Sequence, residues 1–155
     1  MVLQSDNPDP FEFRHPWQRE IHRRLQLIGP GPAQFYKDAC LLMGGDLPLE
    51  SRTHLVSHLL REIESAVRDV LEALLEDGQA KDGHKNEICS ILRALGFEKE
   101  HWVWDAWLQF TGSDSPYALH ARAHRDALAR ARHSDEQLKR LWNQFQKVLA
   151  TVLDR

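Results

Sequence analysis

The chain has 155 residues, which is the size of a single domain. Hydrophobic residues make up 42% and charged residues 28%, so a packed core is expected and a disordered polyelectrolyte is excluded. A net charge of -3 argues against a strongly basic nucleic-acid binder.

The first 15 residues are polar and hold neither the basic start nor the apolar stretch of a signal peptide. We therefore expect a flexible segment over residues 1–15 and one domain over residues 16–155. No run approaches the roughly 20 apolar residues of a membrane span, so no contact with a membrane is expected. Cys40 and Cys89 form no CxxC pair, and two reduced, buried thiols are typical of a cytoplasmic protein.

Glycine and proline divide the remaining chain into intervals whose apolar residues repeat with a period near 3.6, which predicts helices and no sheet. Pro16 favours a helix start because proline suits the first helical position. The predicted helices span Pro16–Ile28, Ala33–Met43, about Ser51–Asp77, Asn86–Leu95, about Lys99–Phe110, Ser115 to about Arg132, and Ser134 to the end. The expected fold class is all-α, a single bundle of six or seven helices.

The third predicted helix has a broad apolar arc, which is typical of a central bundle helix. We expect Leu59, Ile63, Val67 and Val70 to be core positions. The remaining members of the arc are Leu55, Ala66, Leu71 and Leu74, with Val56 and Leu60 beside them. The opposite side carries polar residues, and Glu64 and Arg68 are expected to pair on the outside, one turn apart.

The helix expected over residues 99–110 is dense in tryptophan. Trp104, Trp107 and Leu108 share one side and are expected to cover the bundle core. Trp102 does not fit that side, and an exposed position is expected for it.

Nine histidines include two pairs with i, i+4 spacing, His54 with His58 and His120 with His124. This spacing places two imidazoles on one side of a helix, as in helical zinc sites. No HExxH motif supplies further ligands, so we expect neither a metal nor a cofactor.

The helix expected over residues 115–132 carries the candidate site. His124 lies on an apolar arc and is predicted to be buried and neutral. Arg122 and Arg125 belong to a local excess of positive charge that is read either as pairing with an acidic neighbour or as a small RNA- or phosphate-binding face. These three residues are the candidates for a catalytic or binding role.

The last predicted helix keeps an apolar stripe almost to the end of the chain. The stripe contains Leu138, Leu141, Trp142, Phe145, Val148, Leu149, Val152 and Leu153. Helix ends normally fray and become polar. We therefore expect Val148, Leu149, Val152 and Leu153 to bind a protein partner or a second copy of the chain, most simply as a homodimer.

Two stretches resemble a helical region of uncharacterised bacterial proteins. They are Thr53-His54-Leu55 running into Leu59-Leu60-Arg61-Glu62-Ile63-Glu64, and Ala123-His124-Arg125-Asp126 followed by Trp142 and Phe145. The similarity covers roughly residues 25–153 and extends to the HEPN-like helical domains of toxin and phage-defence systems. It implies an all-helical fold, and no catalytic residue is carried over.

HEPN ribonucleases use an arginine followed by four to six residues and a histidine. Arg52 and His58 have this spacing, but the many arginines and nine histidines make one match expected by chance. The sequence therefore favours a non-catalytic interaction or regulatory module of a bacterial cytoplasm, in defence or toxin regulation. The alternative is a small HEPN-like ribonuclease or RNA-binding protein using His124. Nucleic acid is the less favoured partner.

Overall fold

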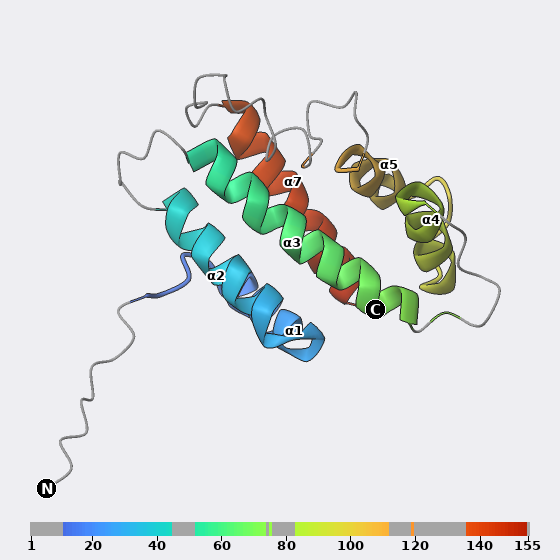
Figure 1. Cartoon of the computed structure of the whole chain (residues 1–155), viewed down its shortest axis with the longest axis horizontal. Helices are drawn as coiled ribbons and strands as arrows, with labels where there is room; N and C mark the ends of the chain where they lie inside the picture. The colour runs from blue at the N-terminus through green and yellow to red at the C-terminus, as the bar shows by residue number, and fades with distance from the viewer. Residues whose placement is uncertain are drawn as a thin grey trace, which may run out of the picture.

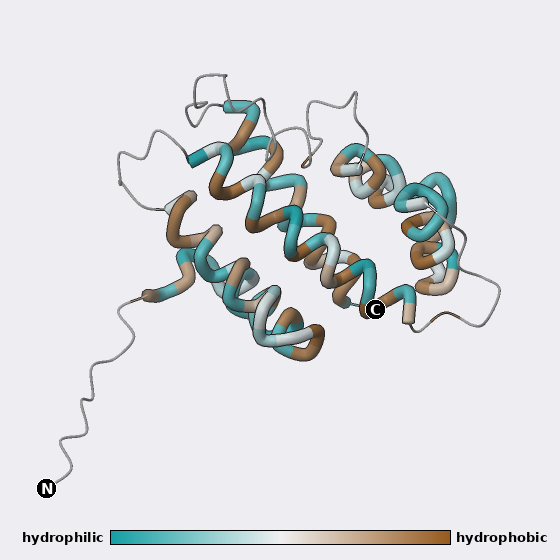
Figure 2. The backbone as a smooth tube through the Cα atoms, in the orientation of Figure 1, coloured by the Kyte–Doolittle hydropathy of each residue, from teal (hydrophilic) through white to brown (hydrophobic). Residues whose placement is uncertain are grey.

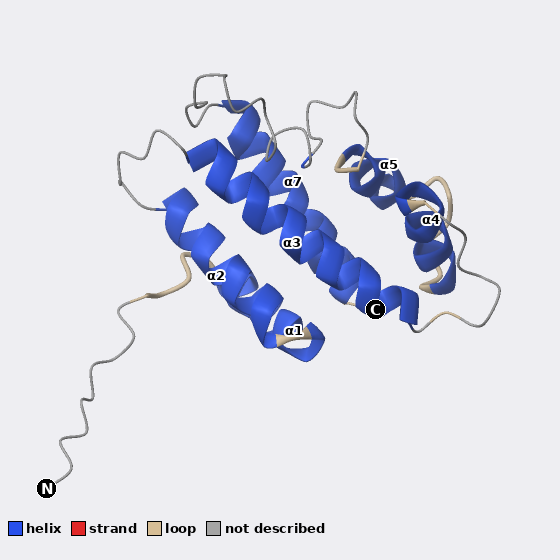
Figure 3. Cartoon of the chain, viewed as in Figure 1, coloured by secondary structure: helices blue, strands red, loops and turns tan. Residues whose placement is uncertain are grey.

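The computed structural model describes residues 11–44, 52–73, 75, 83–111, 119 and 136–154, and these ranges contain helices and no strand (Figures 1 and 3). The prediction of an all-α fold is confirmed. The described helices are α1 (Pro16–Ile28), α2 (Pro30–Gly44), α3 (Arg52–Ala73), α4 (His84–Ala94), α5 (Trp102–Gln109) and α7 (Glu136–Leu153). The helix predicted over residues 115–132 lies outside the described residues, apart from Leu119.

Helix α1 has the predicted bounds, whereas α2 begins earlier than the predicted start at Ala33. Pro30 and Pro32 lie in the first turn of α2, where a backbone N–H has no acceptor within the helix and the fixed φ of proline suits the helix. The backbone N–H of Ala33 donates to the carbonyl of Gly29 (3.4 Å), which joins the turn to the helix. The run of glycine and proline is therefore a helix start and not a loop.

The helices form two flanks around a central pair (Figure 1). Helices α1 and α2 lie on one flank, α4 and α5 on the other, and α3 and α7 lie between them. Helix α3 packs against α2 and α4 and touches α1, while α7 packs against α1 and α5. The first and last described helices are therefore neighbours, and this pairing shapes the groove described below.

One hydrophobic core joins the described helices. Figure 2 shows hydrophobic and hydrophilic residues alternating along α3 and α7, as expected for helices with a buried and an exposed side. Trp104 and Trp107 are buried and Trp102 is 45% exposed, which confirms the prediction for these residues. The indole N–H of Trp104 donates to the carbonyl of Phe97 (3.3 Å).

The buried side of α3 is rotated from the predicted one. Ile63 and Val67 are buried as predicted, but Leu59 and Val70 are only half-buried and Leu55 is 44% exposed. Val56 and Leu60, expected beside the arc, are fully buried, and the polar residues Thr53 and Ser57 are buried with them.

The expectation that Glu64 and Arg68 pair on the outside is wrong, because both side chains are buried. Glu64 is enclosed where α3 meets α5, and Trp107 of α5 donates its indole N–H to the Glu64 carboxylate (3.1 Å). Arg68 lies 3.5 Å from that carboxylate and 3.4 Å from the carboxylate of Glu87 in α4. Helical periodicity assigns charged residues to the solvent, whereas here each charge meets a partner from another helix.

The apolar stripe of α7 is covered within the chain. Val148, Leu149 and Val152 are at most 5% exposed, and Leu153 is half-buried and packs against the same core. A partner was expected because a bare stripe cannot stay in water. That physical reason no longer applies to these four residues, because α1 and α5 already cover the helix.

The described part of the segment expected to be flexible packs against the domain. Phe11 and Phe13 are partly buried against the core. The ring of Phe13 stacks on Tyr36 of α2 at 6.2 Å between centroids and meets Phe11 edge-on at 4.9 Å. Residues 11–15 thereby form one wall of the groove.

Candidate binding groove

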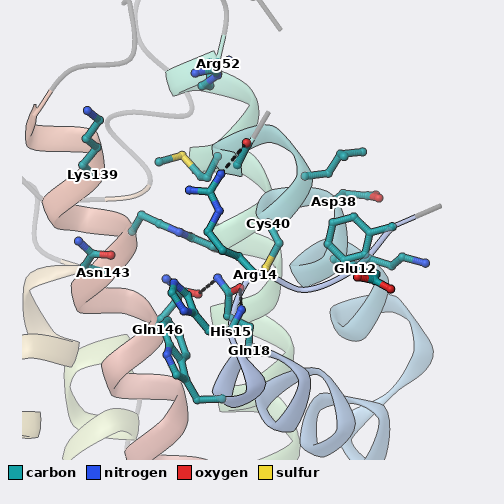
Figure 4. A pocket seen from close by; sticks show the side chains of 17 residues that line it. Glu12, Arg14, His15, Gln18, Asp38, Cys40, Arg52, Lys139, Asn143 and Gln146 are labelled. Atoms are coloured by element: carbon teal, nitrogen blue, oxygen red, sulfur yellow. Dashed lines mark hydrogen bonds between the residues drawn. The ribbon is translucent and has the colours of Figure 1, made fainter. Parts of the chain in front are cut away.

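A groove of about 800 Å³ opens where the N-terminal segment, α1, α2, the start of α3, and α7 meet (Figure 4). Its size is that of a site for a drug-sized molecule or a few peptide residues. Its lining residues are Phe11, Glu12, Arg14 and His15; Trp17 and Gln18 of α1; Lys37, Asp38, Cys40, Leu41, Met43 and Gly44 of α2; Arg52 of α3; and Lys139, Trp142, Asn143 and Gln146 of α7.

Two buried glutamines form the floor of the groove. The backbone N–H of His15 donates to Oε1 of Gln18 (3.2 Å), as part of the capping box that starts α1. Nε2 of Gln18 then donates to Oε1 of Gln146 (3.0 Å), and the Tyr36 hydroxyl donates to the same oxygen (2.8 Å). Gln146 is 2% exposed and links α7 to α1 and α2.

These contacts fix which way each amide faces. A backbone N–H can only donate, so it must meet the oxygen of Gln18. Gln18 must then offer its nitrogen to the oxygen of Gln146, because that order pairs a donor with an acceptor at each step. Both hydrogen bonds to the Gln146 side chain thus end on its oxygen, and within the described residues its NH₂ group has no acceptor.

Cys40 and Tyr36 lie beside this floor and keep their protons. Burial raises the pKa of the Cys40 thiol to about 12, although its hydrogen bond with Tyr36 acts in the opposite direction. Burial also raises the pKa of the Tyr36 hydroxyl well above its ordinary value of 10. Since the thiolate is the nucleophilic form of cysteine, Cys40 is not activated for covalent chemistry at neutral pH.

The charged residues of the groove are unevenly distributed. Arg14, Arg52 and Lys139 lie toward one end in Figure 4, and the carboxylates of Glu12 and Asp38 lie toward the other. Nη2 of Arg14 donates to the carbonyl of Gly44 (3.1 Å), which holds the guanidinium over the groove. Lys139 also forms an ion pair with Glu136 (3.4 Å), and Lys37, which precedes Asp38 in the sequence, lines the groove as well. The lining thus holds four Arg and Lys side chains against two carboxylates and is net positive.

Large apolar side chains stand on the rim. Trp17 is 47% exposed and Leu41 is 50% exposed. The Trp17 ring stacks on the His15 imidazole with centroids 5.1 Å apart and planes 7° from parallel. Exposed apolar groups beside a concave polar surface are typical of an interaction site.

The other polar cluster, around Glu64 and Arg68, is enclosed. Burial raises the pKa of the Glu64 carboxyl, against the lowering effects of Arg68 and of the Trp107 indole N–H. The void beside Glu64 has a volume of about 10 Å³, which is room for a single water molecule. We therefore assign this cluster to packing between α3, α4 and α5, and not to ligand binding.

The candidate residues His124, Arg122 and Arg125 lie outside the described residues, as does His120. Of the other histidine pair, His54 is half-buried and His58 is exposed. Arg52 lines the groove, whereas His58 does not. In the part of the chain that the structure describes, no three His, Cys, Asp or Glu side chains are grouped as metal ligands.

Sequence analysis did not identify the groove residues Gln18 and Gln146. Gln18 carried one usable signal, since it stands at the third position of a helix that begins at Pro16, where a capping box places glutamine. Gln146 directly follows Phe145 of the apolar stripe. A neutral polar residue at the margin of a stripe does not indicate a binding site.

Comparisons with protein-family models, curated proteins and solved structures give no significant match for this chain. The resemblance to HEPN-like domains therefore stays a prediction. Within the described residues, every helix is too short or too polar to cross a bilayer. The groove itself is thus the strongest basis for a function.

Proposed function

We propose that the protein is a non-catalytic interaction module that binds a segment of a partner protein in the groove between α1, α2 and α7. The observation that carries this proposal is the groove of about 800 Å³, whose buried Gln146 amide has its oxygen occupied and, among the described residues, no acceptor for its NH₂. Such a donor is preorganised, so a ligand's carbonyl gains a hydrogen bond without a rearrangement of the floor.

The groove chemistry supports binding over catalysis. Cys40 is the cysteine of the groove lining, and its raised pKa keeps it a thiol. The ribonuclease alternative depends on His124, Arg122 and Arg125, which lie outside the described residues. A role in defence or toxin regulation follows only from the resemblance and stays a prediction.

Photo-crosslinking in the native cell tests the proposal. A photoreactive residue replaces Asn143, an exposed residue of the groove wall, and in a control variant replaces Lys99, which is exposed between α4 and α5. We expect a discrete protein adduct from position 143 and none from position 99. Leu41→Asp, on the opposite rim, should abolish that adduct. Equal adducts from both positions, adducts with RNA alone, or no adduct would overturn the proposal.

A further inference from the structure

We propose that the groove recognises an extended acidic peptide segment that carries a bulky apolar side chain beside its carboxylates. This inference rests on the proposed function and names the chemistry of the partner. It draws on three properties of the groove: the uneven charge, the donor on its floor and the apolar rim.

The uneven charge favours a ligand whose negative charges are placed only where they meet the basic side chains. Arg14, Lys37, Arg52 and Lys139 attract an anion, but Glu12 and Asp38 lie in the same groove and repel one. A single-stranded nucleic acid carries a phosphate at every nucleotide, so it would place negative charge against both carboxylates. A peptide places its carboxylates only where the sequence has them, and it therefore fits the arrangement better.

Arg14 is the best placed anion receptor. Its guanidinium is exposed and is held by one N–H on the carbonyl of Gly44. Other N–H groups of the planar fork remain to form a bidentate pair with a carboxylate. Because the tether fixes the guanidinium before binding, less side-chain entropy is lost when the pair forms.

The hydrogen-bond donor on the floor favours a peptide ligand in an extended conformation. The Gln146 NH₂ needs an acceptor, and a peptide carbonyl supplies one only when it is not already bonded within a helix. An extended segment across the floor offers such a carbonyl. It also directs alternate side chains to opposite sides, so one side chain can meet Trp17 or Leu41 on the rim while its neighbours meet Arg14.

Selection from a displayed library of random dodecapeptides on the full chain tests the inference. We expect enrichment of peptides with clustered Asp and Glu beside Leu, Ile, Phe or Trp. For a selected peptide, Arg14→Glu should weaken binding by about tenfold or more, measured by fluorescence anisotropy. Arg140→Glu is the matched control, because Arg140 is an exposed α7 residue outside the groove lining, and it should leave the Kd within about twofold.

A second variant tests the floor. Gln146→Glu keeps an oxygen for the bonds from Gln18 and Tyr36 but replaces the NH₂ donor with a second acceptor, so binding should weaken at least as much as with Arg14→Glu. Circular dichroism checks that this variant is folded. If it is not, the exposed Arg14 variant still decides the question.

The outcomes separate this inference from the proposed function. Selection of peptides without acidic residues, or an unchanged Kd for Arg14→Glu, would overturn the inference, while a protein adduct from position 143 would leave the module intact. Binding of oligouridine RNA that Arg14→Glu abolishes, with no acidic peptide enriched, would overturn the inference in favour of a nucleic-acid ligand.

Discussion

Burying the Glu64 carboxylate has a cost that its neighbours only partly offset. Glu64 is 7% exposed, and desolvation disfavours its charged form. The charge of Arg68 and the indole N–H of Trp107 favour that form, but the net effect raises the Glu64 pKa above its ordinary value of 4.5. The folded state therefore binds this proton more tightly than the unfolded state does.

This raised pKa predicts a dependence of stability on pH. The contribution of Glu64 is fully present below the ordinary value of 4.5 and is lost as the pH rises through the raised folded pKa. Glu64→Gln should remove that loss, so the free energies of unfolding of variant and wild type should diverge as the pH rises. Urea unfolding across pH 4–8 measures this, with the exposed Glu62→Gln as control. Parallel pH profiles for all three proteins would contradict the prediction.

Cys40 should be the slower of the two cysteines to react. Its pKa of about 12 leaves almost no thiolate at pH 8, and its side chain is buried, whereas Cys89 is half-buried. Brief treatment with iodoacetamide at pH 8 should modify Cys89 first, as seen by peptide mass spectrometry. Both should react equally in urea. Modification of Cys40 first in the folded protein would mean that the groove activates it.

At the scale of single helices, much of the fold was predictable from local chemistry. Pro16 and the glycine after Ile28 set the bounds of α1, and periodicity located the helices that follow. The burial of Glu64 and Arg68 in α3 was not predictable in this way, because their partners Trp107 and Glu87 belong to other helices. Local patterns identify a helix, whereas its neighbours decide which side is buried.

The rotated side of α3 can be tested by truncation. Ile63→Ala should lower the free energy of unfolding by about 2–5 kcal/mol, because Ile63 is fully buried. Leu55→Ala, at a position that is 44% exposed, should cost under about 1 kcal/mol. Denaturant unfolding gives both values. Equal losses would place the buried side of α3 where periodicity alone predicts it.

At the scale of the whole molecule, the groove could not be found from the sequence. Gln18 and Gln146 are separated by 128 positions and meet only because α1 packs against α7. Glutamine is uncharged, and neither residue belongs to a sequence motif that indicates a binding site. The sequence predicted that both helices exist. That α1 and α7 pack against each other is known only from the three-dimensional structure.

Burial of the apolar stripe of α7 within one chain can be tested by placing a charge in it. Leu149 is 4% exposed within one chain, so Leu149→Lys places a charge in the core and should destabilise the bundle by several kcal/mol, a loss typical of an unpaired buried charge. We expect loss of helicity by circular dichroism, with Lys147→Ala, at an exposed position of α7, as the folded control. If the wild type sediments as a dimer and the Leu149→Lys variant as a helical monomer, the stripe would be an interface between two chains.

RNA cleavage through Arg52 and His58 is not expected. Arg52 lines the groove, whereas His58 is exposed and lies outside its lining. Arg52→Ala and His58→Ala should therefore match the wild type when each purified protein is incubated with labelled RNA. Degradation by the wild type that either variant lacks would establish the enzyme instead.

The pairing of the first and last described helices also sets an order of assembly during synthesis. A chain still emerging from the ribosome can form α1, α2 and α3, but Gln18 and Tyr36 have no Gln146 to bond until α7 has been translated. The groove then acquires its floor and its α7 wall in one late step. Contacts between distant parts of a chain form slowly, so completion of this step is expected to limit folding. A partner that binds the groove would therefore engage only chains in which α7 has already been made.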